Sequence, residues 1–177
     1  MNIKLKNNFL YLDQYKIKCA VGKRGITSNK VEGDKKTPKG IFRFKSIFYR
    51  KDKIFKIKCL LKKTIIKKNM GWCDDVHSKY YNTLIKFPFK AGAEKLYLNN
   101  SIYDVIVIID YNLKPIIKGK GSAIFLHISR RNYKPCEIIP FYKGPFKPSH
   151  CNWWKFFQGI PKRFSFLRHL FIVFGTS

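Results

Sequence analysis

Two residues in the second half of the chain have the chemistry of an acyl-transfer pair. His127 ends a run of apolar residues, and Cys136 follows it nine positions later. A thiol with its ordinary pKa of about 8.5 is mostly protonated at neutral pH, and a nearby imidazole can take the proton or stabilise the thiolate. The pair suggests a cysteine nucleophile with its base. The alternative is a strand and a loop that only happen to contain both residues.

The segment that carries the histidine is predicted to be a β-strand. Residues 123–129 read AIFLHIS, and a period of two places Ile124, Leu126 and Ile128 on one face of such a strand. His127 then lies on the opposite face, away from the main aliphatic layer and at the end of the strand. We expect it at the beginning of a loop, where a cleft can form.

Other segments predict a chain made mostly of strands. The β-branched run 103–109 is typical of a central strand, and the turn-rich residues 33–40 lead into a strand over 41–48. Residues 8–21 alternate roughly between apolar and polar, which predicts one strand that leads into a loop. Near the C-terminus, apolar residues at helical spacing within 164–174 predict a short helix.

The composition indicates one globular unit with an extreme charge. The 177 residues are 45% hydrophobic and 16% aromatic, and the formal net charge is +27. Such a charge attracts polyanions through a salt-sensitive field. The lysines are scattered along every segment, however, and abundant Lys, Asn, Ile and Phe also follow from an AT-rich genome. We favour this compositional explanation over a groove built for one polyanion.

The cysteines indicate neither a zinc site nor a disulfide framework, because they form no CxxC pair and no regular spacing. There are five of them, and most are expected to be small buried residues: Cys19, Cys59, Cys73, Cys136 and Cys151. The Asp74, Asp75 and His77 cluster has low specificity for a metal and is interpreted as a loop that forms caps and hydrogen bonds. No metal and no cofactor are expected.

No leader or membrane anchor is visible in the sequence. The first 20 residues have a basic start but alternate polar and apolar residues, without the apolar core of a signal peptide. No stretch approaches the roughly 18 consecutive apolar residues of a spanning helix. Lysines with aromatic residues around Trp153 and Trp154 allow base or sugar stacking, or a place at a membrane surface, but packing is the more common use. Nucleic acid is not an expected partner, because no recognised binding motif accompanies them.

Three stretches together resemble the YkuD-type L,D-transpeptidase catalytic domain family. They are EGDKKTPKGIFRF at 32–44, GWCDDVHSKYYN at 71–82 and GKGSAIFLHISRRNYKP at 119–135. The resemblance implies a mainly β fold, a sandwich or barrel with minor helices. It also implies a cysteine thiolate that attacks the carbonyl between a diamino acid and the terminal D-alanine of a peptidoglycan stem peptide. D-alanine leaves, and an amine of a second stem peptide, or water, then resolves the thioester.

The resemblance assigns the role of the base to His127 and leaves the nucleophile open. In the branch that this sequence resembles most, the segment after the strand continues into a Thr-Glu-Gly-Cys-like turn. A gap-free alignment places Cys136, Glu137, Ile138 and Ile139 on those four positions. Isoleucine cannot attack a carbonyl, and the residue that replaces glycine lacks easy access to left-handed backbone geometry. On this alignment the catalytic region is incomplete and the chain is inactive.

Two alternatives keep a nucleophile. Cys136 is the nucleophile if the loop before it is three residues shorter than in the family, although Glu137 beside it raises the thiol pKa. Cys151 serves if residues 149–152, Ser-His-Cys-Asn, replace the Ser-His-Gly-Cys form of other branches. A third interpretation is that a shifted reading frame encodes the C-terminal part, which the other frames of the DNA would test.

The sequence therefore predicts an L,D-transpeptidase-like domain over residues 1–137 and a divergent, aromatic-rich tail over 138–177. Its predicted function is cysteine acyl transfer on peptidoglycan stem peptides, with His127 and Cys136 as site residues. The alternative is a non-catalytic module of the same fold that binds the cell wall or anionic wall or membrane polymers. The resemblance implies a place in the periplasm or cell envelope. The oligomeric state does not follow from the sequence.

Overall fold

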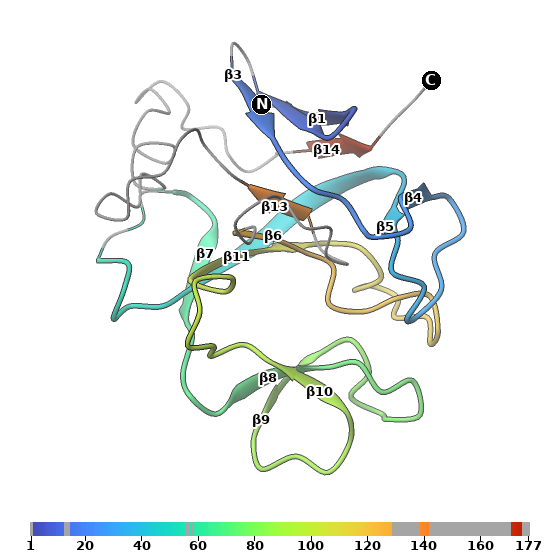
Figure 1. Cartoon of the computed structure of the whole chain (residues 1–177). Coiled ribbons are helices and arrows are strands. Elements are labelled where there is room, and N and C mark those ends of the chain that lie inside the picture. The colour runs from blue at the N-terminus through green and yellow to red at the C-terminus, as the bar shows by residue number, and fades with distance from the viewer. Residues whose placement is uncertain are drawn as a thin grey trace.

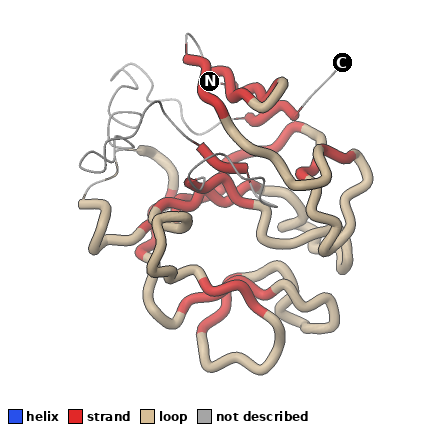
Figure 2. Tube along the Cα trace, in the orientation of Figure 1, coloured by secondary structure: helices blue, strands red, loops and turns tan. Residues whose placement is uncertain are grey.

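β-strands make up the regular structure of the described part of the chain in the computed structural model (Figures 1 and 2). The structure describes residues 2–12, 15–55, 57, 59–128, 139–141 and 171–174. No helix lies within these residues. The prediction of a mainly β protein is confirmed.

Most strands belong to one nine-stranded sheet with the order β13-β12-β11-β6-β14-β1-β2-β3, in which β7 pairs with β6 outside this path. The bounds of these strands are β1 (Asn2–Lys6), β2 (Phe9–Leu12), β3 (Tyr15–Lys18), β6 (Ile41–Tyr49), β7 (Lys62–Ile65), β11 (Val105–Ile109), β12 (Phe125–Ile128), β13 (Ile139–Phe141) and β14 (Phe171–Phe174).

Two smaller sheets complete the described fold. One has the order β10-β8-β9, and the other pairs β4 with β5 in parallel. Their bounds are β4 (Ile26–Thr27), β5 (Thr37–Pro38), β8 (Met70–Cys73), β9 (Leu84–Lys86) and β10 (Ala93–Lys95). Figure 1 shows the three-stranded sheet below β6 and β11 of the large sheet.

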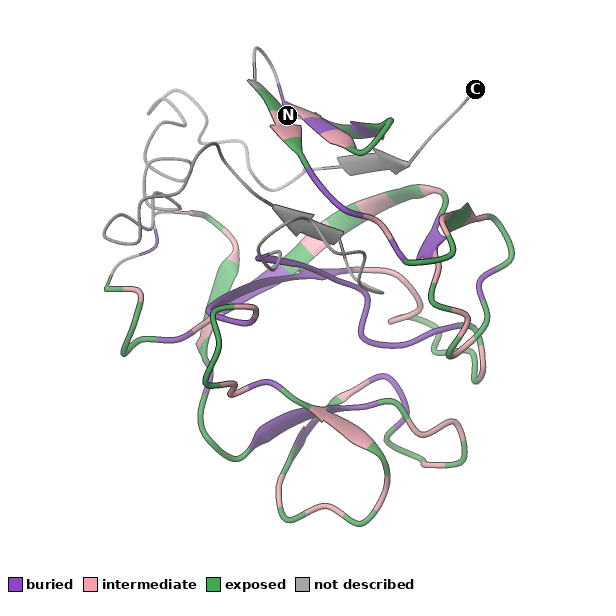
Figure 3. Cartoon of the chain, in the orientation of Figure 1, coloured by how far each residue is buried: buried purple, intermediate pink, exposed green. Residues whose placement is uncertain are grey.

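The central strand β11 is buried on both faces, as the β-branched run predicted. Its sequence is Val-Ile-Val-Ile-Ile, and all five residues are buried. Val105, Val107 and Ile109 contribute to one core, while Ile106 and Ile108 contribute to a second. A strand that is covered on both sides is expected to be continuously apolar, without alternation. Figure 3 shows the buried stretches along β11 and along β8.

The first core brings distant strands of the large sheet into contact. Ile3 and Leu5 of β1 and Leu10 of β2 pack in one cluster with Val107 of β11 and Leu126 of β12. In the sheet order, β1 and β2 are separated from β11 and β12 by β6 and β14. The sheet must therefore curl so that the β1 and β2 side chains cover its middle strands. This curl agrees with the sandwich or barrel that the sequence predicted.

The second core attaches the three-stranded sheet to the large one. Trp72 of β8 packs edge-on against Phe125 of β12 at a ring-centroid distance of 5.1 Å, and against Phe48 of β6 at 6.4 Å. Met70 and Leu96 belong to the same buried cluster. Edge-to-face aromatic pairs contribute about 1 kcal/mol each beyond their buried area, so this core holds the two sheets together.

The N-terminal segment differs from its prediction. We expected one strand over residues 8–21, but the chain forms β2 and β3, which pair antiparallel after a hairpin from β1. Asn7 and Asn8 lie between β1 and β2 with φ of 50° and 60°. Asparagine tolerates this left-handed geometry, and two such residues form the tight turn that matches the twist of a hairpin.

The C-terminal helix prediction is wrong where the structure describes it. Residues 171–174 form strand β14, which lies between β1, its parallel partner, and β6, its antiparallel partner. The remaining residues of the predicted helix, 164–170, lie outside the described residues. Ile172 and Val173 are β-branched and favour a strand, so the helical spacing of the phenylalanines was misleading.

The first testable consequence concerns the central strand. Replacing the fully buried Ile106 with alanine removes contacts within the second core and leaves a cavity. Ile106→Ala is expected to lower the free energy of unfolding by about 2 to 4 kcal/mol. Ile41→Ala in β6, where the side chain is 64% exposed, is the matched control and should cost less than about 1 kcal/mol. Equal losses in urea unfolding would contradict this assignment of the core.

Candidate active site

His127 lies in β12 between two other strands. Its register partners are Ile106 of β11, which runs antiparallel, and Pro140 of β13, which runs parallel. Ala123 and Phe125 belong to the second core, while Ile124 and Leu126 belong to the first, so the predicted division of the strand into two faces is confirmed. The His127 side chain is only 2% exposed, however. It is buried beside the aromatic core, where we had expected a cleft.

A hydrogen bond at Nδ1 of the histidine ring sets its tautomer. Nδ1 lies 2.7 Å from the backbone carbonyl oxygen of Ile128. A carbonyl oxygen can only accept, so Nδ1 donates its proton to it. In the neutral imidazole the basic lone pair is therefore on Nε2. This is the orientation that a general base requires, because the second nitrogen then accepts the proton.

Aromatic side chains of the second core pack against the histidine ring. Tyr103 packs edge-on against the His127 ring with centroids 5.3 Å apart and planes at 87°, and it also contacts Phe125 at 6.5 Å. The Tyr103 hydroxyl donates a hydrogen bond to Oε1 of Glu94 on β10. The three-stranded sheet thus holds the tyrosine that packs against the histidine. A tightly packed neighbour restricts the imidazole to few orientations.

The described cysteines are not suited to be nucleophiles. Cys19 is buried in the first core, and burial raises the pKa of its thiol to about 12. Burial also raises the pKa of Cys59. Cys19 and Cys73 are buried and Cys59 is half-buried, which confirms the expected packing role for the first two. The remaining thiols, Cys136 and Cys151, lie outside the described residues.

Asn82 joins three segments at the entrance to β12. Its Oδ1 accepts hydrogen bonds from the Trp72 indole at 2.8 Å and from the Ala123 backbone N–H at 3.1 Å. Its Nδ2 donates to the Asn112 carbonyl oxygen at 2.7 Å. Asn82 is buried and has a φ of 54°. One amide therefore fixes the chain where it enters the strand that carries His127.

Glu32 makes a second connection between distant segments. Its Oε2 accepts a hydrogen bond from the Tyr81 hydroxyl, and its backbone N–H donates to the Gly119 carbonyl oxygen at 2.8 Å. Burial, followed by the contact with Glu32, raises the pKa of Tyr81, so the phenol stays protonated and keeps donating. The three stretches 32–44, 71–82 and 119–135 therefore meet through Glu32 and Asn82.

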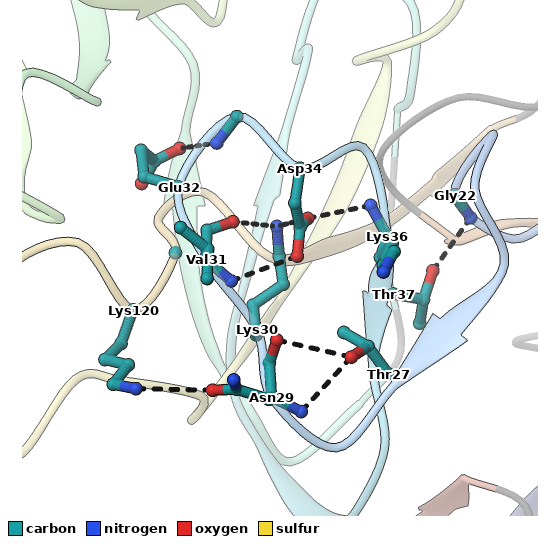
Figure 4. A network of polar contacts seen from close by, with 12 residues as sticks. Gly22, Thr27, Asn29, Lys30, Val31, Glu32, Asp34, Lys36, Thr37 and Lys120 are labelled. Carbon is teal, nitrogen blue, oxygen red and sulfur yellow. Dashed lines mark hydrogen bonds and ion pairs between the residues drawn. The ribbon is translucent and has the colours of Figure 1, made fainter.

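The loop before β5 is closed by Asp34 (Figure 4). The Lys30 ammonium donates to Oδ1, the Val31 N–H donates to Oδ2 at 3.0 Å, and the Lys36 N–H donates to Oδ1 at 2.9 Å. Burial by itself would raise the pKa of Asp34. The hydrogen bonds from Lys30, Val31 and Lys36 together lower it below its usual value.

The polar loop after β8 forms side-chain hydrogen bonds, as the sequence predicted, but no helix follows it for it to cap in the described part of the chain. The Asp75 Oδ1 accepts the backbone N–H of His77 at 2.9 Å. Burial raises the pKa of Asp74, and the negative charges of Glu32 and Asp75 add to the effect. Among the described residues no three His, Cys, Asp or Glu side chains are placed to hold a metal ion.

Sequence reasoning identified His127 but missed the residues that position it. Asn82, Glu32 and Tyr81 lie inside the quoted stretches, yet they were given no role. Their partners are 41 and 49 residues away along the chain, so no local pattern could reveal the contacts. Tyr103 was interpreted only as the beginning of a strand.

A mainly β fold in which a buried strand presents an oriented imidazole is suited to acyl transfer by general-base catalysis. The chain belongs to the YkuD family, the L,D-transpeptidase catalytic domain, whose family model matches residues 3–150. This family is found among cell-wall enzymes and acts on peptidoglycan stem peptides. No curated protein and no solved structure matches the chain significantly.

The match extends over part of the predicted tail. It includes all three quoted stretches and Cys136, and it ends one residue before Cys151. Strand β13, which also follows residue 137, pairs with β12. The division of the chain at residue 137 stays a prediction. No helix in the described part of the chain is long and apolar enough to cross a membrane.

The three hydrogen bonds of the Asn82 amide give a second prediction. Asn82→Ala removes an acceptor for two buried N–H groups and leaves a β-carbon at positive φ, so we expect a loss of about 3 kcal/mol in the free energy of unfolding. Asn82→Gly loses the same hydrogen bonds but relaxes the backbone, and it should be about 1 kcal/mol more stable than the alanine variant. Urea unfolding measures both. If Asn82→Ala lowers the free energy of unfolding by less than about 0.5 kcal/mol, Asn82 does not stabilise the fold in this way.

The Asp34 loop gives a prediction for pH. The folded-state pKa of Asp34 is lowered, so its stabilising contribution is present above the unfolded pKa of about 3.9 and is lost as the pH falls through the folded pKa. The stability difference between wild type and Asp34→Asn should therefore stay constant above about pH 5 and shrink below about pH 4. Thermal unfolding across this range measures it.

Asp74→Asn is the control of opposite sign. The pKa of Asp74 is raised in the folded state, so protonation stabilises the fold as the pH falls. The difference between wild type and Asp74→Asn should shift in favour of wild type at low pH. The same pH dependence in both variants would show that the two local environments are wrong.

Proposed function

We propose that this chain acts on peptidoglycan stem peptides by cysteine acyl transfer, with His127 as the base and Cys136 as the nucleophile. The observation that carries the proposal is the Nδ1 contact of His127 with the Ile128 carbonyl oxygen, which leaves the basic lone pair on Nε2. Family membership over residues 3–150 supplies the substrate class, and that range contains both residues.

The proposed reaction has two balanced steps. Nε2 of His127 takes the thiol proton, and the thiolate sulfur attacks the carbonyl carbon that precedes the terminal D-alanine. A C–S bond forms, the C–N bond breaks, and D-alanine leaves with the proton from the imidazolium. An amine of a second stem peptide, or water, then attacks the thioester, and the thiol is regenerated.

Two further observations favour Cys136 over Cys19 and Cys59. Burial raises the pKa of Cys19 and Cys59, which makes their thiolates scarce at neutral pH. Cys136 precedes Ile139 by three residues, and Ile139 is the register partner of Leu126, the neighbour of His127. Along the sequence, β13, the partner of the base-bearing strand, therefore begins three residues after Cys136.

One observation favours a second function, binding of the stem peptide without catalysis. The gap-free alignment places the family nucleophile at Ile139, and β13 runs beside β12 at that residue. On that alignment the position next to the base-bearing strand holds a side chain that cannot attack a carbonyl. The domain would then bind the peptide and leave it unchanged.

Muropeptide analysis with the purified full chain tests both functions. We expect D-alanine release or new crosslinks from wild type, a loss of at least about a hundredfold in His127→Gln and Cys136→Ala, and no loss in Cys151→Ala. Cys59→Ala is the matched control for removal of a thiol. Intact-mass analysis should show a stem-peptide adduct on wild type that is absent from Cys136→Ala.

Other outcomes separate the candidates. Loss of activity in Cys151→Ala alone would transfer the nucleophile to Cys151. Inactive wild type that binds a stem pentapeptide in calorimetry, with equal affinity in every cysteine variant, would establish the binding function in place of the enzyme.

A further inference from the structure

A phenylalanine is displayed almost fully to solvent on the loop between β6 and β7. Phe55 is 95% exposed, and Leu60 on the same loop is 55% exposed. Scattered exposed apolar residues are common on protein surfaces. A phenylalanine at this exposure is different, because burying its large apolar surface would stabilise the fold, and here that surface stays in water.

Hydrogen bonds hold the part of the loop that precedes Phe55. The N–H groups of Lys53 and Ile54 both donate to the Arg50 carbonyl oxygen, at 3.1 and 2.8 Å. The Lys53 ammonium donates to Asp104 at 2.9 Å. This turn leaves the backbone little freedom to carry Phe55 toward the core.

Arg50 anchors the turn to the body of the protein. Its guanidinium lies 3.5 Å from the centroid of the Tyr97 ring and donates to the Leu98 carbonyl oxygen at 2.5 Å. It also forms a two-point ion pair with Asp52, at 2.8 and 2.6 Å. Arg50 is itself buried. On the other side of Phe55, Ile57 is buried in the first core, so the phenylalanine projects from between two fixed points.

Lysines are frequent in the sequence on both sides of Phe55. Residues 51–68 contain eight lysines and a single acid, Asp52, which Arg50 already binds. Lys51, Lys62 and Lys63 are exposed on the described parts of this stretch. The neighbouring carboxylate does not cancel their charge, and the resulting local field attracts anions.

The combination of an apolar anchor and a lysine cluster narrows the choice of partner. A soluble polyanion would use the lysines and leave Phe55 in water. A second copy of the chain would bring two chains of net charge +27 together, and repulsion opposes that contact. An anionic bilayer offers both negative headgroups and an apolar interior within reach of one side chain.

We propose that the loop between β6 and β7, together with the first residue of β7, is a peripheral binding site for an anionic lipid bilayer, with Phe55 inserted among the acyl chains and Lys51 and Lys62 on the headgroups. This surface operates independently of the acyl-transfer site. It holds the domain at the membrane surface whether or not the domain is an active enzyme.

Vesicle cosedimentation of the full chain tests the proposal. Wild type should bind vesicles of phosphatidylcholine mixed with phosphatidylglycerol and not vesicles of phosphatidylcholine alone. Phe55→Ser should weaken binding about tenfold, and Lys51→Gln with Lys62→Gln should weaken it by a similar factor and reduce its dependence on salt. All these side chains are exposed, so the variants should keep the wild-type unfolding midpoint.

The matched control is Ile117→Ser. Ile117 is 54% exposed in another lysine-rich loop, beside the exposed Lys118, and should bind vesicles as wild type does. The proposal is overturned if Phe55→Ser binds as tightly as wild type or if Ile117→Ser loses as much. It is also overturned if wild type binds polyphosphate and ignores anionic vesicles, because the site would then recognise soluble polyanions through charge alone.

Discussion

The position of His127 depends on the side-chain amide of Asn82. This amide accepts the Trp72 indole and the Ala123 N–H, and it donates to the Asn112 carbonyl oxygen, all inside the protein. A slip of one residue in a strand moves every side chain to the other face. By fixing the chain just before β12, Asn82 keeps His127 on the aromatic side and Leu126 on the aliphatic side. Ordering of the base thus begins at a residue that is distant from it.

Three acidic residues in the described part of this basic protein have structural roles. The chain has ten aspartates and glutamates against 37 lysines and arginines. Asp34 closes a loop with Lys30, Glu32 accepts from Tyr81, and Glu94 accepts from Tyr103. Each carboxylate meets a donor from another part of the chain or closes a turn. Many lysines in the described part of the chain are exposed, and there their charge can attract an anionic partner without disturbing the interior.

The sequence predicted those parts of the fold whose signal is local. The β-branched run of β11 and the alternation of β12 were enough to identify a central strand and the two faces around His127. The turn at Asn7 and Asn8 was missed, although asparagine tolerates the positive φ that both central residues of a two-residue hairpin turn require. At residues 171–174, phenylalanine spacing suggested a helix, whereas the intervening β-branched residues favoured the observed strand.

The site was predictable only in part, for a physical reason. The type and context of His127 stand out in one stretch of sequence. Its burial and its contact with Tyr103 involve residues that meet only after folding. The same is true of the hydrogen bonds of Asn82 and Glu32. The family match shows the family over residues 3–150. It does not identify the nucleophile, because the gap-free alignment places Ile139 at that position and the two alternatives place Cys136 or Cys151 there.

The central claim is that His127 activates the thiol of Cys136. Site-resolved alkylation by iodoacetamide, followed by mass spectrometry across a range of pH, tests it most directly because only the thiolate reacts. Cys136 should be alkylated faster than Cys59 at neutral pH, and this advantage should disappear in His127→Gln. If Cys136 reacts no faster than Cys59, and at the same rate in wild type and in His127→Gln, the claim is wrong.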